Sequence, residues 1–151
     1  MMDDLDQLMA VMEASFDPHF REAWTRRQVE ESLTLPSTYM LLIDAAGERP
    51  REGETAVGFV LARQAADEIE LLLIAIMPDW RGRGLGRKLL HLFLDSARSR
   101  SADKVFLEMR SNNPAERLYR AAGFTQIGQR KDYYRTLSGE TIDALTFART
   151  V

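Results

Sequence analysis

A short segment, residues 81–88, contains three glycines and four basic side chains at a spacing suited to binding a phosphate group. The glycines are Gly82, Gly84 and Gly86, and the basic residues are Arg81, Arg83, Arg87 and Lys88. An apolar run over residues 71–77 precedes the segment, and apolar residues at helical spacing follow it. The first amide groups of a helix are unpaired and partially positive, and glycine lets backbone approach an anion closely. The segment therefore predicts an anion site, with phosphate as the preferred ligand.

The spacing of this segment does not match two other phosphate-binding motifs. A P-loop requires glycine, four further residues and then Gly-Lys, but the fifth residue after Gly82 is Arg87. A dinucleotide fingerprint requires a third glycine three residues after the second, but that position after Gly84 is again Arg87. The alternative to an anion site is a basic surface turn without a ligand.

Two glutamates within predicted strands are candidates for a general base. Glu108 lies between apolar neighbours in the strand of residues 104–109, where burial would raise its pKa toward the neutral range. Glu70 lies in the central strand, and strict alternation would place it on the same face as Ile74 and Ile76. Either carboxylate could instead reach solvent or pair with an arginine. The residues alone leave both candidates open.

Helices that would position these side chains are predicted from apolar spacings of three and four residues and from capping signals. The predicted helices are residues 2–16, a segment from Thr25 to Leu35-Pro36, residues 85–97, and a short segment from Asn113-Pro114 to Gly123. Thr25 and Asn113 are the candidate N-caps, and Pro114 suits a first helical position.

Six strands complete the predicted fold. They cover residues 39–43, 56–64, 68–77, 104–109, 124–134 and 142–149. The run over residues 71–76 lacks alternation, as expected for a strand covered on both faces. The order of helices and strands predicts an α+β fold, a mixed and mostly antiparallel central sheet flanked by helices. No linker divides the chain, so we expect a single domain over residues 1–151.

The composition argues against several classes of protein. The chain has 151 residues, of which 45% are hydrophobic and 28% charged, as is ordinary for one globular domain. It has no cysteine, which excludes disulfides, thiolate metal sites and a cysteine nucleophile, and which fits a cytoplasmic location. A net charge of −3 argues against nucleic acid or an anionic membrane as partners. No metal site is expected.

Two separate motifs resemble the GNAT family of N-acetyltransferases. The segment Arg81-Gly82-Arg83-Gly84-Leu85-Gly86 matches the family signature Arg/Gln-x-x-Gly-x-Gly/Ala. The preceding Ile74-Ala75-Ile76-Met77-Pro78 is similar to the family's splayed strand. A later block combines Leu107-Glu108-Met109-Arg110-Ser111-Asn112 with Ala115, Leu118-Tyr119 and Gly123-Phe124. The predicted order of elements agrees along nearly the whole chain, so the resemblance implies the GNAT fold with a splayed pair of central strands.

The resemblance implies acetyl-coenzyme A as the acetyl donor. The backbone of Ile74 and Ile76 would pair with its pantetheine arm, the amides of the turn of residues 81–86 would hold its pyrophosphate, and Asn112 would hydrogen-bond to it. The residues that the resemblance assigns to the cofactor are Ile74, Ala75, Ile76, Arg81, Gly82, Arg83, Gly84, Leu85, Gly86, Arg87, Asn112 and Tyr119.

Within the family, the closest resemblance is to the RimI-type group, bacterial members that acetylate the N-terminal alanine of a small-subunit ribosomal protein. The matching segments are Ala23-Trp24-Thr25, Leu107-Glu108-Met109-Arg110, Gly128-Gln129-Arg130-Lys131-Asp132-Tyr133-Tyr134, and Gly139 with Asp143-Ala144-Leu145. Glu108 matches the base position of that group, and Tyr119 matches the general acid that protonates the leaving thiolate. The alternative for Tyr119 is a purely structural role as a core aromatic residue on an amphipathic helix.

Amide formation from a thioester requires a neutral amine and a stabilised oxyanion. The backbone N–H of Ile76 is the expected oxyanion donor. Because the chain has no cysteine, an acetyl-cysteine intermediate is impossible and we expect direct transfer. Trp24, Tyr133 and Tyr134 are candidates for the acceptor site, because aromatics with polar tips can grip a peptide backbone. Plain packing is the alternative for all three.

The expected acceptor is the N-terminal α-amine of a protein. A peptide α-amine titrates near pH ~7.8 and a lysine near pH ~10.4, so lysine costs about 3.5 kcal/mol more to deprotonate at pH 7. A small-molecule amine or a lysine side chain is the alternative acceptor on the same scaffold. The expected partners are therefore acetyl-coenzyme A and either a protein N-terminus or a small amine, with the enzyme a monomer or weak homodimer.

Two hypotheses from other classes remain. A non-catalytic acyl-coenzyme-A-binding module would need the cofactor site without the acid and base, and the presence of Glu108 and Tyr119 counts against it. RNA binding through residues 81–88 is opposed by the net charge of the chain and would require salt-dependent binding.

Overall fold

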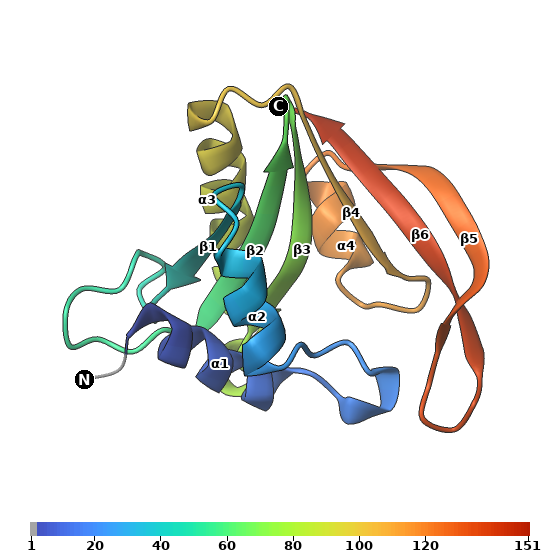
Figure 1. Ribbon diagram of the computed structural model, residues 1–151, viewed down its shortest axis with the longest axis horizontal. Helices are drawn as coiled ribbons and strands as arrows, with labels where there is room; N and C mark the ends of the chain where they lie inside the picture. Colours follow the sequence, from blue (N-terminus) through green and yellow to red (C-terminus); the bar gives the residue numbers. More distant parts are fainter. Residues whose placement is uncertain (1–2) are drawn as a thin grey trace.

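The computed structural model describes residues 3–151 and contains a six-stranded sheet with helices on both faces (Figure 1). The helices are α1 (Asp4–Ser15), α2 (Arg26–Leu33), α3 (Leu85–Ser99) and α4 (Glu116–Ala121), with short 3-10 turns η1 (Pro18–Phe20) and η2 (Pro78–Trp80). The strands are β1 (Thr38–Ile43), β2 (Gly58–Ala65), β3 (Glu68–Ile76), β4 (Lys104–Arg110), β5 (Thr125–Arg135) and β6 (Thr141–Thr150). None of these described helices has the length and apolar character that crossing a bilayer requires.

The predicted fold class and order of elements are confirmed. The strand order is β1-β2-β3-β4-β6-β5, and only β3 and β4 run parallel, so the sheet is mixed and mostly antiparallel. Thr25 is the N-cap of α2, as predicted, and forms a capping box with Gln28. The helix ends at Leu33, slightly before Leu35-Pro36. Met2, assigned to the first predicted helix, lies outside the described residues.

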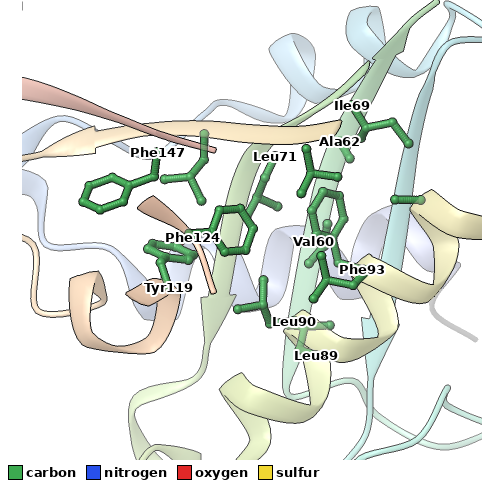
Figure 2. Packing of buried hydrophobic residues seen from close by; sticks show 14 of the residues in the cluster. Val60, Ala62, Ile69, Leu71, Leu89, Leu90, Phe93, Tyr119, Phe124 and Phe147 are labelled. Atoms are coloured by element: carbon green, nitrogen blue, oxygen red, sulfur yellow. The ribbon is translucent and has the colours of Figure 1, made fainter. Parts of the chain in front are cut away.

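Two hydrophobic clusters cover the two faces of the sheet. On one face, α3 and α4 pack against the central strands, and Figure 2 shows the rings of Tyr119, Phe124 and Phe147 gathered beside Leu71 of β3. On the other face, α1 and α2 pack against β2 and β3. The central strand β3 is therefore covered on both sides, which agrees with its lack of alternation.

The central strands β3 and β4 separate after a short stretch of pairing. They pair from Glu68 with Lys104 to Leu71 with Leu107, and no pairing follows that point. Figure 1 shows the two strands together at one end and apart at the other. The separated ends leave one edge of β3 without a partner strand, which confirms the expected splayed pair.

A bulge in β3 changes which residues share a face. Leu61 pairs with Leu73 and Ala62 with Leu71, so Leu72 is an extra residue in β3. Ile69 and Leu71 before the bulge pack toward α3, whereas beyond it the even-numbered positions do so. An extra residue reverses the alternation of a strand. The prediction that Glu70 shares a face with Ile74 and Ile76 is therefore wrong, since Glu70 lies on the opposite face.

The short helix α4 begins later than predicted. Asn113 does not cap the helix directly, and Pro114 is not its first residue, because the helix starts at Glu116 with Ala115 as N-cap. The Asn113 side chain instead accepts a hydrogen bond from the Ala115 amide at 2.9 Å. This local side-chain turn postpones the helix by two residues. Gly123, at φ +91°, follows the end of the helix, as predicted.

Candidate active site

The unpaired edge of β3 presents backbone groups to the gap between β3 and β4. The Met77 amide donates to the Val57 carbonyl at 2.8 Å, toward β2. Since successive residues of a strand point their backbone groups in opposite directions, the N–H and C=O of Ile76 point away from β2. The Arg81 Nε donates to the Ile76 carbonyl from this side at 3.0 Å. By the same alternation, the backbone of Ile74 also faces the gap.

The glycine-rich turn lies directly beyond this edge and leads into α3. Gly82 and Gly84 adopt φ values of +76° and +79°, which residues with a Cβ rarely adopt, and open space surrounds both. Gly84 is the N-cap of α3 and has no side chain to satisfy the first amides of the helix. Among the described residues, the amides of residues 82–87 find no acceptor. Such a row of N–H groups has the chemistry that an anion site requires, as the sequence predicts.

A cavity of about 440 Å³ connects the β3 edge and the turn with α4 and the segment that follows α1. It is lined by Ser15, Phe16, Asp17, Phe20, Glu22, Ile74, Ala75, Ile76, Arg81, Gly86, Arg110, Asn113, Pro114, Ala115, Leu118 and Tyr119. Gly86 permits close packing here, because a Cβ at this position would lie 3.4 Å from the Leu118 side chain. We call this space the central cavity.

Tyr119 has a buried ring and lines the central cavity. Its ring packs edge-on against Phe124 with centroids 5.8 Å apart, and the residue is 4% exposed. Its hydroxyl forms no hydrogen bond with any residue in 3–151. Burial raises the pKa of this phenol above its usual value, and the negative charge of Glu22 raises it further. The two interpretations of Tyr119, a core aromatic and a general acid, are thus compatible, because its ring is buried while its hydroxyl has no hydrogen-bond partner among residues 3–151.

Glu22 is a carboxylate of the central cavity that the sequence analysis did not identify. Its Oε1 lies 3.3 Å from Nε of Arg110, and both side chains are mostly buried. The aromatic ring of Phe20 lies against the Arg110 guanidinium, with 3.6 Å between Cζ and the ring centroid. A lone glutamate before Ala23-Trp24 gives no sequence signal of this role, because its partner is 88 residues away.

Glu108 and Glu70 lie on the same face of the sheet as each other, and neither lines the central cavity. Glu108 pairs with Arg130 at 3.3 Å and accepts a weak hydrogen bond from Thr146. Its side chain is 22% exposed, so the expected burial is incomplete, because its apolar neighbours point to the other face. Glu70 pairs with Arg63 at 2.9 Å.

The three aromatic candidates for the acceptor site are separated in the structure. Tyr134 is half-buried, and burial and then the charges of Glu108 and Glu22 raise its pKa to about 12. Tyr133 is exposed and stacks edge-on against Tyr134. Trp24 packs against the cluster of α1 and α2 and does not line the central cavity.

The basic side chains of the turn point in different directions. Arg81 bridges the Ile76 carbonyl and the Ser15 carbonyl at the end of α1. Arg83 stacks on Trp80, and Lys88 reaches the Ala46 carbonyl. Arg87 lines a second space of about 880 Å³ between α3 and α4. We call this space the α3/α4 groove.

The α3/α4 groove adds further positive charge near the turn. Arg117 of α4 and Arg149 of β6 line it together with Arg87, and Leu118 lines both the groove and the central cavity. The sequence analysis missed Arg117 and Arg149, because they are far from the glycine-rich segment in the chain. Tertiary packing therefore extends the basic character of the turn along the helix pair.

Asn112, expected to contact the cofactor, is bonded to Arg110, and its neighbour Asn113 lines the central cavity instead. The Asn112 carbonyl and side-chain oxygens both accept hydrogen bonds from Arg110, at 3.0 and 2.7 Å. Asn112 does not line the central cavity, whereas its neighbour Asn113 does. The sequence analysis did not consider Asn113 as a cavity residue.

Comparison with known proteins identifies related sequences and structures. The model of the acetyltransferase (GNAT) family matches residues 6–124. The N-alpha-acetyltransferase RimI of Mycobacterium tuberculosis is 42% identical over 104 residues, which cover 66% of this chain and 62% of that protein. The ribosomal protein bS18-alanine N-acetyltransferase of Haemophilus influenzae is 33% identical over 97 residues, covering 64% and 66%. The chain thus matches less than two thirds of the length of these relatives.

A solved structure agrees over almost the whole chain. The crystal structure of the ribosomal-protein-S18-alanine N-acetyltransferase from Escherichia coli superposes with a TM-score of 0.82 at 25% identity. The match covers 98% of this chain and 88% of that one. The similarity therefore extends beyond residue 124, where the family match ends, into the β5–β6 hairpin.

Proposed function

This chain belongs to the acetyltransferase (GNAT) family, and from that membership we propose that it transfers an acetyl group from acetyl-coenzyme A to the N-terminal α-amine of a protein. We further propose alanine as the terminal residue and a ribosomal protein as the substrate. The names of the Haemophilus influenzae relative and of the Escherichia coli structure support this choice. The name of the Mycobacterium tuberculosis relative, an N-alpha-acetyltransferase, supports an α-amine as the acceptor. The lower cost of deprotonating an α-amine, compared with a lysine, supports it independently.

The residues of the chain fit acetyl-coenzyme A. The free amides of residues 82–87 suit its pyrophosphate, and the unpaired edge of β3 suits the amides of its pantetheine arm, as one strand pairs with another. Arg87, Arg117 and Arg149 in the α3/α4 groove provide charge for a further phosphate. When bound, the cofactor supplies the activated acetyl group, and the protein supplies position and proton transfer.

Three groups of the protein would act on the reacting atoms. The Ile76 amide, which faces the gap, donates a hydrogen bond to the oxygen that becomes negative as the amine adds. Glu108 accepts the proton of the amine. The Tyr119 hydroxyl keeps its proton at neutral pH because its pKa is raised, and it donates this proton to the departing sulfur.

One observation carries the proposal. A single cavity is lined by the unpaired edge of β3, by the first turn of α3 and by Tyr119. The hydroxyl of Tyr119 has no hydrogen-bond partner among residues 3–151. A binding module would need the first two features but not the third. The non-catalytic and RNA-binding hypotheses therefore have no equivalent support.

Mass spectrometry after incubation with acetyl-coenzyme A tests the proposal. The substrates are a peptide that starts with alanine, the same peptide with a blocked α-amine and an internal lysine, and a panel of small amines. We expect one acetyl group on the first peptide and none on the blocked one. Acetylation of only the lysine or of small amines would replace the proposed acceptor, and no acetylation of any substrate would contradict the proposed activity.

A further inference from the structure

Glu22 occupies a position in the central cavity that the mechanism above does not use. Glu22 lines the same cavity as Tyr119, and its Oε1 lies 3.3 Å from Nε of Arg110, which also lines the cavity. The other carboxylate of the cavity wall, Asp17, is exposed and accepts a hydrogen bond from the His19 amide. Glu22 is therefore the mostly buried acidic side chain of the cavity wall.

The backbone before Glu22 adopts a costly conformation that directs this side chain. Arg21 has φ +57° and ψ +34°, a left-handed conformation that costs a residue with a Cβ roughly 1 kcal/mol. The turn at Arg21 lets Phe20 cover the face of Arg110 while Glu22 meets its edge. A further bond from the Leu137 amide to the His19 carbonyl, at 3.0 Å, attaches this segment to the β5–β6 hairpin. The position of Glu22 is thus fixed from several sides.

Arg110 holds only one of the two carboxylate oxygens of Glu22. Its Nε contacts Oε1, its Nη1 donates to Asn112, and its face is covered by Phe20. Among residues 3–151, Oε2 of Glu22 has no hydrogen-bond partner. A carboxylate that is anchored by one oxygen and free at the other can accept hydrogen bonds from a cationic ligand.

We propose that Glu22 binds the protonated amino group of the acceptor and that Arg110 positions it for this contact. This inference rests on the proposed function, because it assigns the residue that recognises the acceptor. An N-terminal amine is largely protonated at neutral pH, so a site that selects it needs an anion beside the reacting centre. The proton of the amine then passes to Glu108, the base of the proposed function.

The variant Glu22→Gln tests this assignment, with Glu13→Gln on the exposed side of α1 as the matched control. Charged hydrogen bonds typically give a tenfold or larger effect, so we expect the KM for an alanine peptide to rise roughly ten- to a hundredfold in Glu22→Gln. The KM for acetyl-coenzyme A should stay within about twofold. Glu13→Gln should leave both values unchanged.

A second measurement separates recognition of charge from a structural role. Calorimetry on the enzyme with coenzyme A gives the affinity of the alanine peptide with a free and with an acetylated N-terminus. We expect the wild type to prefer the free peptide by tenfold or more, Glu22→Gln to lose this preference, and Glu22→Asp to keep part of it. Because the ratio is taken within one variant, partial unfolding does not change it.

The outcomes distinguish this inference from the proposed function. If the wild type acetylates the peptide and Glu22→Gln keeps the same preference for the free amine, the assignment of Glu22 is wrong and the activity stands. If the wild type acetylates no N-terminal amine, both are overturned.

Discussion

Tyr119 combines a ring buried in the core with a place on the wall of the central cavity, where we propose that its hydroxyl acts as the acid. Its ring is part of the cluster under α3 and α4, and its hydroxyl has no hydrogen-bond partner among residues 3–151. The environment that buries the ring also raises the pKa of the phenol, which keeps the proton on the donor. The carboxylates differ from this phenol, because Glu22, Glu70 and Glu108 are each paired with an arginine at the surface of the sheet or of the cavity.

Tyr119→Phe should lower kcat about a hundredfold, as is typical when a general acid is removed. The affinity for coenzyme A should stay within about twofold, because the ring remains. Steady-state kinetics and calorimetry measure the two quantities. Tyr39→Phe is the control, since the Tyr39 hydroxyl bonds to Ser96 away from the cavity, and it should leave kcat unchanged. An unchanged kcat in Tyr119→Phe would exclude the acid role.

Glu108→Gln and Glu70→Gln decide between the two candidate bases. We expect Glu108→Gln to lower kcat at neutral pH by about a hundredfold and Glu70→Gln to change it by less than about threefold. Glu108 acts on Tyr134 through its charge, whereas Glu70 is paired with Arg63 beside the closed end of the strands. The reverse result would assign the base to Glu70, and two small effects would remove both.

Among the elements, β3 determines the geometry of the site. Its bulge at Leu72 lies where β3 and β4 stop pairing, and beyond it the strand presents a free edge. The following turn places the free amides of α3 next to that edge. Arg81 ties the turn to β3 and to the end of α1 through two carbonyls, so the three elements keep a fixed relation.

Gly84→Ala tests the glycine-rich turn. The alanine would have to adopt φ +79°, so we expect about 1 kcal/mol of lost stability and a turn that no longer presents its amides, with the KM for acetyl-coenzyme A raised at least tenfold. Gly53→Ala, at φ +83° in the β1–β2 loop, is the matched control. It should lose similar stability with an unchanged KM. Equal KM values in the two variants would contradict the anion site.

At the scale of the whole molecule, the site forms where distant parts of the chain meet. The segment between α1 and α2, the separated ends of β3 and β4, and α4 all contribute walls to the central cavity. The β5–β6 hairpin joins the first of these through Leu137 and His19. Figure 1 shows this hairpin extending beside the end of the sheet where the strands are apart.

Folding also changes the titration of the phenols. Burial raises the pKa of Tyr39, Tyr119 and Tyr134, whereas an unfolded phenol titrates near pH ~10. Below pH ~10 both states keep these protons, and above it the unfolded state releases them first. The free energy of unfolding should therefore fall between pH 10 and 12. Urea titrations over this range measure it, and Tyr134→Phe should reduce the slope. A flat profile would contradict the raised pKa values.

Local patterns in the sequence determined most of the elements and the position of the turn. Apolar spacing, the Thr25 cap and the glycines act through neighbouring residues, so the order of helices and strands was predicted within a few residues. The late start of α4 was not, because a side-chain bond from Asn113 to the Ala115 amide competed with the helix.

Only the tertiary structure decided which side chains meet. Because of the bulge at Leu72, Glu70 lies on the opposite face of the sheet from Ile74 and Ile76. Because side chains alternate along β4, the apolar neighbours of Glu108 point to the other face. The pairing of Glu22 with Arg110 joins residues 88 positions apart. The spacing of residues along the chain predicts contacts within one or two turns of a helix or a few residues of a strand. The lining of a cavity depends instead on how distant elements pack together. The sequence therefore determined the elements and the glycine-rich turn, and the fold decided the composition of the cavity.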